Sequence, residues 1–377
     1  MTECCDAKSL KSLRLASRGC AAKLHRVYVR FFFTNIGVLL CREHSISAAV
    51  NVIHHPVFGP SVQTISFYVD PIPLPKWPPM STFSLEHRVA TGKFRNEYDN
   101  MRHQSTDVRL LRELFSELKK QSRILPLKID GDADLSSHPP IGLGAMMNNH
   151  GTLYLDTYDI GPVSILVTAI EKSKYQPASL SISSTASIPV HRADIDNHRS
   201  SRASPTPLQT VVQGLKHLDI AIWCDYRSQM NAIEFGAVLA SAPILETLTL
   251  RIKSDNPEET HQRPEDSRQI RRAFLDVAGV VEIILKRTMP TLTKLAIHGP
   301  AAAFGDLVSF VRRHDRLQEV ELKGAKIWCG TDDERCHNIT TSTETVSQAL
   351  IRLTKLSVVD VDKEADQWWE DRDTWLI

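Results

Sequence analysis

The chain lacks an excess of charge of either sign. Its 377 residues include 45 Lys and Arg against 44 Asp and Glu, which leaves a formal net charge of +1. Nucleic acids and anionic membranes attract proteins mainly through positive charge. We therefore expect no nucleic acid and no membrane as the main partner of this chain, and we expect a protein partner instead.

The chain also lacks a long apolar run. Basic residues are scattered through the N-terminal segment, so it has no apolar stretch of the kind found in a secretory signal. The longest apolar stretch, around 277–285, is broken by Glu282 and is far shorter than the ~20 residues that a membrane span needs. We expect no transmembrane helix and an intracellular protein, located in the cytoplasm or the nucleus.

Cysteine is scarce and irregularly placed. The seven cysteines are odd in number and scattered, a pattern that in a reducing compartment indicates free thiols. They are Cys4, Cys5, Cys20, Cys41, Cys224, Cys329 and Cys336. We expect no disulfide framework.

Catalytic signatures are missing as well. The sequence has no G-x-S-x-G, no G-x-x-x-x-G-K-[ST], no G-x-G-x-x-G and no H-E-x-x-H motif. We therefore expect no enzyme and no cofactor. The alternative is a hydrolase whose catalytic groups come together only in the folded chain, because triads are assembled in space rather than in sequence.

What the chain does contain is a recurring apolar rhythm, apolar-x-x-apolar-x-apolar. The alternating residues at its end predict a short strand with one buried face, and the earlier leucine turns the chain into that strand. The five instances are Leu215, Leu218, Ile220 and Ile222; Leu245, Leu248, Leu250 and Ile252; Leu292, Leu295 and Ile297; Leu317, Val320 and Leu322; and Leu353, Leu356 and Val358.

Helical patterns separate these strands, at 230–243, 266–290 and 304–315. Stacked parallel strands need such crossovers, and each helix-strand unit buries its apolar face only against its neighbours. We predict an α/β fold, an irregular leucine-rich-repeat-like solenoid of short parallel strands alternating with helices. The steps between the strand residues Leu250, Ile297, Leu322 and Val358 are 47, 25 and 36 residues, so the repeats are irregular.

The first half of the chain fits the same scheme less regularly. Strands are predicted at 61–69, 124–129 and 178–183, and helices at 108–122 and 161–174. The resulting divisions are a helical N-terminal segment at 1–35, a lead-in with the first strand at 36–75, a proline-rich linker at 76–92, degenerate repeats at 93–190, a mobile loop at 191–207, leucine-rich repeats at 208–360 and a cap or tail at 361–377.

Two groups of residues resemble metal ligands. Asp130, Asp132 and Asp134 start like a calcium loop, but the sixth and twelfth places of that loop hold Leu135 and Ile141 instead of Gly and Glu, so we favour an acidic turn. A second group, with the spacing C-x6-C-H, matches no standard zinc site, and we favour an exposed loop there. Its members are Cys329, Cys336 and His337.

Two other motifs have structural interpretations. His54 and His55 precede Pro56 and are interpreted as the end of a helix followed by a turn. Trp368, Trp369 and Trp375 lie among acidic residues, where aromatic side chains are candidates for anchors at a protein interface. The alternative, which we favour, is that they belong to a segment that covers the last repeat.

The repeat region 208–327 resembles the F-box and leucine-rich-repeat proteins of filamentous fungi. The resemblance rests on LASAPILETLTL, on MPTLTKLAIHG and on LVSFVRRHDRLQEVELKGAKI. It extends to IHHPVFGPSVQTISFYVD and FRNEYDNMRHQSTDVRLLRELFSELKKQSRI, and LKSLRLASRGCAAKLHRVYVRFFF is similar to the end of an F-box. The first half of an F-box, with its Leu-Pro-x-Glu helix, has no counterpart in this sequence.

This resemblance implies a substrate-recognition protein of a cullin-RING ubiquitin ligase. It further implies that a Skp-type adaptor binds the N-terminal segment, and that Leu10, Leu13 and Leu15 are the residues that match the adaptor-facing helix. The alternative is a leucine-rich-repeat interaction protein without coupling to a ligase.

Overall fold

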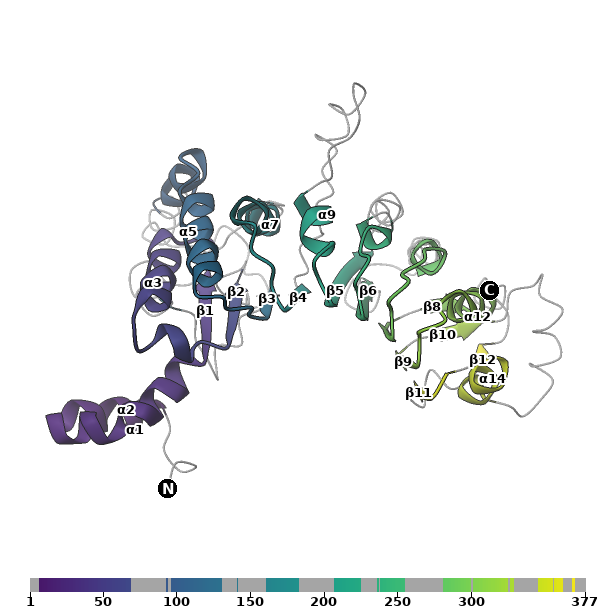
Figure 1. Cartoon of the computed structure of the whole chain (residues 1–377), viewed down its shortest axis with the longest axis horizontal. Coiled ribbons are helices and arrows are strands. Elements are labelled where there is room, and N and C mark those ends of the chain that lie inside the picture. The colour runs from purple at the N-terminus through teal and green to yellow at the C-terminus, as the bar shows by residue number, and fades with distance from the viewer. Residues whose placement is uncertain are drawn as a thin grey trace, which may run out of the picture. The chain divides into compact units, whose positions relative to one another are not determined.

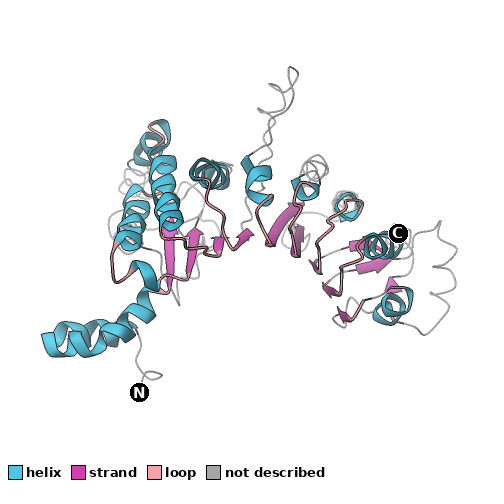
Figure 2. Ribbon diagram, viewed as in Figure 1, coloured by secondary structure: helices cyan, strands magenta, loops and turns pink. Residues whose placement is uncertain are grey.

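The fold was analysed in a computed structural model, which forms two compact units, Met1–Ala178 (unit 1) and Ser179–Ile377 (unit 2). Figure 1 shows its elements by label, and Figure 2 shows helices and strands by colour. The structure describes residues 7–68, 93, 96–130, 141, 161–182, 207–224, 236, 238–254, 281–299, 301–324, 326–328, 345–354, 356–361 and 368–369.

Unit 1 is a parallel sheet with helices on one side of it (Figure 2). The strands pair in the order β1–β2–β3, with Ile36 opposite Ile65 and Ile65 opposite Leu127. The elements are α1 Ala7–Ala16, α2 Arg18–Phe33, β1 Asn35–Leu39, α3 Glu43–His54, the 3-10 helix η1 Gly59–Ser61, β2 Thr64–Tyr68, α5 Thr106–Lys120, β3 Leu127–Asp130 and α7 Gly161–Ser173.

The core of unit 1 lies between this sheet and helices α3, α5 and α7. The apolar positions of α5 recur at three and four residues, so that Leu111, Leu114 and Leu118 share the face that is fully buried. The ring of Phe115 stacks on Tyr175 with 5.3 Å between ring centroids, and the Tyr175 hydroxyl accepts a hydrogen bond from the Leu125 backbone N–H. The helix predicted at 108–122 and the strands predicted around Ile65 and Leu127 are therefore confirmed.

Strand β1 was not anticipated from the sequence. Its segment NIGVL contains a central glycine, and four of its five residues are buried, so it shows no alternation of buried and exposed positions. The edge of β1 away from β2 is covered at one point, where the Ile141 N–H donates to the Gly37 carbonyl. The sheet of unit 1 therefore begins one strand earlier than the sequence analysis expected.

Unit 2 repeats the same arrangement with more strands. Its main sheet is parallel, in the order β4–β5–β6–β7–β9–β11, and a second parallel sheet has the order β12–β10–β8. The elements are β4 Ser179–Ile182, α9 Pro207–Val212, β5 His217–Cys224, β6 Thr247–Ser254, β7 Lys294–His298, β8 Ala301–Ala303, α12 Phe304–Arg313, β9 Glu319–Lys323, β10 Lys326–Trp328, α14 Val346–Leu353, β11 Val358–Val361 and β12 Trp368–Trp369.

Five strands of the main sheet of unit 2, β4, β5, β6, β7 and β9, bury their alternate residues, whereas β11 buries none of its residues fully. Leu218, Leu248, Leu295 and Val320 occupy one register row, and the next row contains Ile220, Leu250, Ile297 and Leu322; all eight are at most 1% exposed. The prediction of an α/β fold with parallel strands alternating with helices is confirmed. Because each row joins four neighbouring strands, burial of one leucine depends on the strands beside it.

A shared carbonyl marks the start of five strands, β1, β5, β6, β7 and β9. The Lys216 carbonyl, one residue before β5, accepts hydrogen bonds from the N–H groups of both Glu246 and Thr247, at 2.8 and 2.9 Å. The same two-donor contact recurs at the carbonyls of Glu246, Thr293 and Gln318, and in unit 1 at that of Thr34. This contact fixes the register between successive strands before the regular ladder begins.

The last repeat lies in a different register from the predicted one. The sequence analysis aligned Leu353, Leu356 and Val358 with Leu317, Val320 and Leu322, but the structure pairs Val359 with Val320 and Val361 with Leu322. The corresponding triplet is therefore Leu356, Val359 and Val361, a shift of three residues. Burial agrees, since Leu356 is 7% exposed whereas Val358 is 49% exposed.

The remaining predictions fall partly on described residues. The helix predicted at 304–315 is α12, and the helix predicted at 161–174 is α7. Of the helix predicted at 230–243, only 236 and 238–240 are described as helical, and of the helix predicted at 266–290, only 281–285. The proline-rich segment 76–92 lies outside the described residues. So does the predicted loop 191–207, apart from Pro207, which begins α9.

A buried histidine joins α12 to the turn before β7. His314 is 3% exposed, its Nε2 accepts the Met289 backbone N–H at 2.8 Å, and its Nδ1 lies 2.7 Å from the Phe310 carbonyl. The neutral ring with its proton on Nδ1 satisfies both contacts. Burial lowers the pKa of His314 below its ordinary value, because a second proton would be poorly solvated and would oppose the Met289 donor.

We predict that His314→Gln destabilises the protein less at acidic pH than at pH 7.5. The unfolded chain takes up a proton near its ordinary pKa of 6.5, whereas the native ring resists it, so the wild type loses stability as pH falls below that value. The gap between the urea midpoints of the two proteins should narrow from pH 7.5 to pH 5. A gap that stays constant with pH would contradict this account.

Candidate functional site

The main sheet of unit 2 presents a polar face on the side away from its helices. Along each strand the residues between the buried ones point to this face, because side chains alternate in a strand. We call these residues the strand face. Its described members with polar or charged side chains are Ser179, Ser181, His217, Asp219, Thr247, Thr249, Arg251, Lys294, His298, Glu319, Glu321, Lys323 and Asp360.

The centre of the strand face is a group of ion pairs around Glu321. Lys294 Nζ lies 2.6 Å from Glu319 Oε1 and 3.2 Å from Glu321 Oε2, and His298 Nε2 lies 3.2 Å from Glu321 Oε1. Lys323 donates to the same oxygen of Glu321. Neighbouring parallel strands supply these groups, since Lys294 and His298 come from β7 and the three others from β9.

The electrostatics of this group follow from its geometry. Hydrogen bonds from Lys323 and then from Lys294 and His298 outweigh burial and lower the pKa of Glu321 to about 2. Hydrogen bonding to Glu319 raises the pKa of Lys294. The carboxylate and the ammonium groups therefore stay charged across the neutral range, and they hold one another in place.

A second group of charges lies on the next three strands of the same face, β6, β5 and β4. Arg251 donates to Asp219 Oδ2 at 2.5 Å, and the Ser181 hydroxyl donates to the same oxygen at 3.2 Å. The row that joins Asp219 to Glu321 passes through Thr249 and the buried Ala296, which have small side chains. The strand face thus presents two fixed groups of mixed charge.

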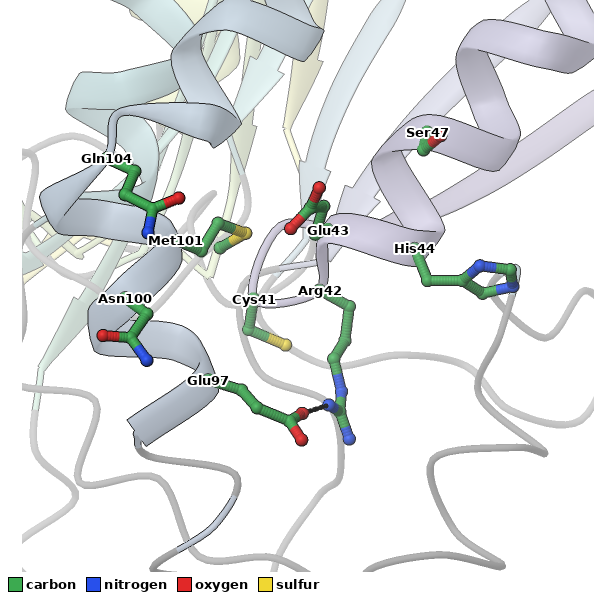
Figure 3. A pocket seen from close by; sticks show the side chains of 9 residues that line it. All are labelled: Cys41, Arg42, Glu43, His44, Ser47, Glu97, Asn100, Met101 and Gln104. Atoms are coloured by element: carbon green, nitrogen blue, oxygen red, sulfur yellow. Dashed lines mark hydrogen bonds and ion pairs between the residues drawn. The ribbon is translucent and has the colours of Figure 1, made fainter.

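Unit 1 contains a cavity of about 620 Å³ where α3 begins beside a helical segment at 96–103. Figure 3 shows its lining, in which Arg42 forms an ion pair with Glu97 at 2.7 Å. Cys41 and His44 both belong to this lining, but the ring of His44 points away from the Cys41 thiol (Figure 3). The thiol and the imidazole are therefore not arranged as a nucleophile and its base.

The residues that the sequence analysis singled out at the two ends of the chain lie in separate units. Leu10, Leu13 and Leu15 lie in α1 of unit 1, and Leu15 is 86% exposed. Trp368 and Trp369 form β12 in unit 2, paired with Ile327 and Trp328 of β10, and Trp375 lies outside the described residues. The roles of both groups in binding stay predictions.

The candidate metal ligands are not brought together in the described part of the chain. Asp130 ends β3, whereas Asp132, Asp134, Cys329, Cys336 and His337 lie outside the described residues. Among the residues that are described, no three His, Cys, Asp or Glu side chains form a group that could hold a metal ion.

The interpretation of His54 and His55 is confirmed. His54 ends α3, and the imidazole of His55 accepts hydrogen bonds from the backbone N–H groups of Val57 and Phe58, at 3.1 and 3.2 Å. His55 therefore shapes the turn that leads to η1.

The strand face was not predicted from the sequence, although its signal is present there. In TLTLRI, KLAIH and EVELK the residues between the buried positions are the ones that form the ion pairs. Only the register between strands brings Lys294 opposite Glu319 and His298 opposite Lys323. That register can be read from the aligned leucines, so the outward rows could have been predicted by extending the same alignment.

Comparisons with known proteins give no family for this chain. No family model matches it, and no curated protein matches it significantly. None of the helices in the described part of the chain has both the length and the apolar character needed to cross a bilayer.

We predict that removing the Lys323 ammonium raises the pKa of Glu321. In Lys323→Met the carboxylate loses the contact that contributes most to its low pKa of about 2, so it should titrate at a higher pH. Carbon-13 labelling of glutamate and NMR titration would measure this. Lys286→Met, on the helix side of unit 2, is the matched control and should leave the pKa of Glu321 unchanged; an equal pKa in wild type and Lys323→Met would refute the assignment.

Proposed function

We propose that this chain is a protein-interaction scaffold of the leucine-rich-repeat type, without a catalytic role. One observation carries the proposal: the strand face holds charges of both signs at fixed positions on a rigid parallel sheet. Charges that are fixed before binding give specificity at low entropic cost, and a mosaic of both signs suits a protein partner better than a polyanion.

The size of the strand face sets a requirement on the partner. Six strands about 4.8 Å apart span roughly 24 Å, and strands of about five residues are roughly 16 Å long. Their product is about half of the ~800 Å² that each partner buries in a standard interface. The bound protein should therefore contact the loops at the strand ends as well as the strand face.

Within this class we propose an F-box-like receptor that recruits a substrate to a cullin-RING ubiquitin ligase. The support is the resemblance of the repeat region and of the N-terminal helical segment to F-box and leucine-rich-repeat proteins. In that N-terminal segment α1 and α2 pack together, and Leu15 is largely exposed. In this proposal the strand face binds the substrate, and α1 contacts a Skp-type adaptor. The alternative is an interaction scaffold that has no ligase coupling and uses the strand face alone.

Charge reversal tests the role of the strand face. In affinity capture, the variant Arg251→Glu, Lys294→Glu, Lys323→Glu should fail to retain the proteins that the wild type retains. Each reversed charge would repel the acidic group of the bound protein that the original cation attracted. The matched control is Lys286→Glu, Arg312→Glu, Arg316→Glu, which makes the same charge change on the helix side. Identical protein sets from all three chains would refute the strand face as the binding surface.

Two measurements show whether a loss of capture results from unfolding of the variant. Circular dichroism should show the same helix and strand content in the three chains. The single variant Lys323→Glu changes a side chain that is 50% exposed, so it should fold normally and still weaken capture.

Adaptor binding separates the two forms of the proposal. The F-box-like form predicts that the full-length folded chain co-purifies with a Skp-type adaptor, and that Leu15→Asp weakens the complex because it places a charge at an apolar contact. A folded chain that fails to bind the adaptor removes the ligase role and leaves the interaction scaffold. Lys174→Asp, at another exposed site in unit 1, is the control and should retain binding.

A further inference from the structure

Positive charge is concentrated at one end of a chain that is nearly neutral. Residues 7–41 contain seven Lys and Arg and no Asp or Glu. Since the whole chain carries +1, all its other residues together carry −6. The basic residues are Lys8, Lys11, Arg14, Arg18, Lys23, Arg26 and Arg30. The net charge of the whole chain therefore hides a strongly basic helical segment.

Three of these cations form a stripe along α2. Lys23, Arg26 and Arg30 are spaced at three and four residues, which places them on one face of the helix, and all three are exposed. No ion pair involves any of them among the described residues of unit 1. The small residues Gly19 and Ala22, which are also exposed, leave the stripe accessible.

Other positions of α2 are already in use. Val29 is buried, α1 packs against the helix, and the Arg14 guanidinium lies 4.0 Å from the centre of the Tyr28 ring. At the C-terminal end of α2 the Phe33 ring stacks on Phe58, with 4.2 Å between ring centroids. These contacts hold α2 on unit 1, and they leave Lys23, Arg26 and Arg30 exposed.

We propose that this outward face of α2, formed by Lys23, Arg26 and Arg30, is a docking surface for an acidic helical segment of another protein. The cations are spaced like the i, i+3 and i+7 positions of a helix, so carboxylates with the same spacing can pair with them one by one. Among the described side chains of α1 and α2, Leu15 and Phe31 are large, apolar and exposed, at 86% and 37%. This inference is independent of the role proposed for the strand face.

Two other anionic partners fit the surface less well. A helix that lies in a bilayer inserts an apolar face, but the apolar side of α2 is covered in part by α1. Binding of single-stranded nucleic acid relies on several aromatic side chains that stack on successive bases, whereas Gly19 and Ala22 lie beside the cations of the stripe and Phe31 is 37% exposed. Both partners are outcomes of the test below.

The test measures binding of the full-length chain to fluorescent peptides by anisotropy. One peptide is an amphipathic helix with Glu at every third or fourth position and Leu on the opposite side; the second has Gln in place of every Glu. We expect the Glu peptide to bind about tenfold or more tightly than the Gln peptide, and we expect added salt to weaken it. Equal binding of both peptides, or no binding of either, would overturn the proposal.

A charge-reversal variant locates the surface. Lys23→Glu, Arg26→Glu, Arg30→Glu should weaken binding of the Glu peptide by about tenfold or more, since three attractive contacts become repulsive. The matched control, Lys119→Glu, Lys128→Glu, Lys172→Glu, changes exposed cations elsewhere in unit 1 by the same amount and should bind as the wild type does. Circular dichroism checks that both variants remain folded.

The competing occupants are tested with the same proteins. The wild type could bind phosphatidylserine vesicles or a DNA oligonucleotide more tightly than the Glu peptide, with this binding lost in the α2 variant. That result would show that the partner of this surface is a membrane or a nucleic acid and not a protein. Self-association of the chain in sedimentation, lost in the same variant, would replace it with a second copy. Each of these results overturns the proposal as stated.

Discussion

The structure depends on the hydrogen bonds through which one strand sets the register of the next. At the start of five strands a single carbonyl oxygen accepts two successive N–H groups from the following repeat. Buried backbone groups must be paired, so a shift of one residue would break these contacts and would also turn every buried leucine to the other face. The carbonyl contact and the apolar rows therefore support one another, and both the core and the strand face follow from them.

The sequence predicts this fold well where each strand has one buried face. The rows of Leu218 and Ile220 and of their counterparts could be read directly, because alternation and burial agree. Strand β1 could not be read, because Gly37 interrupts it and both of its faces are buried. In LTKLSVVDV two frames fit the rhythm, with Leu353 or Leu356 as the first residue, and only the pairing of Val359 with Val320 selects the second.

The candidate site was harder to predict than the fold. Apart from the Lys323–Glu321 pair, its ion pairs join residues of different strands, so no local motif contains them, and the irregular steps between the repeats hide the alignment. The low pKa of Glu321 is an example. It depends on Lys323 of the same strand and on Lys294 and His298 of the neighbouring strand. A strand face with fixed charges of both signs supports recognition of a protein whose surface also carries both signs. The basic stripe on α2 suits an acidic segment instead. The chain thus has two surfaces of different charge character, one in each unit.

The register is the central claim, and amide hydrogen exchange tests it most directly. The N–H groups of Glu246, Thr247, Thr293, Lys294, Gln318 and Glu319 donate to the shared carbonyls. NMR or mass spectrometry should find them strongly protected, together with Ser357 and Val358 of the last repeat. Exchange of these amides at the rate of an unfolded chain, in a protein with intact secondary structure, would contradict the account.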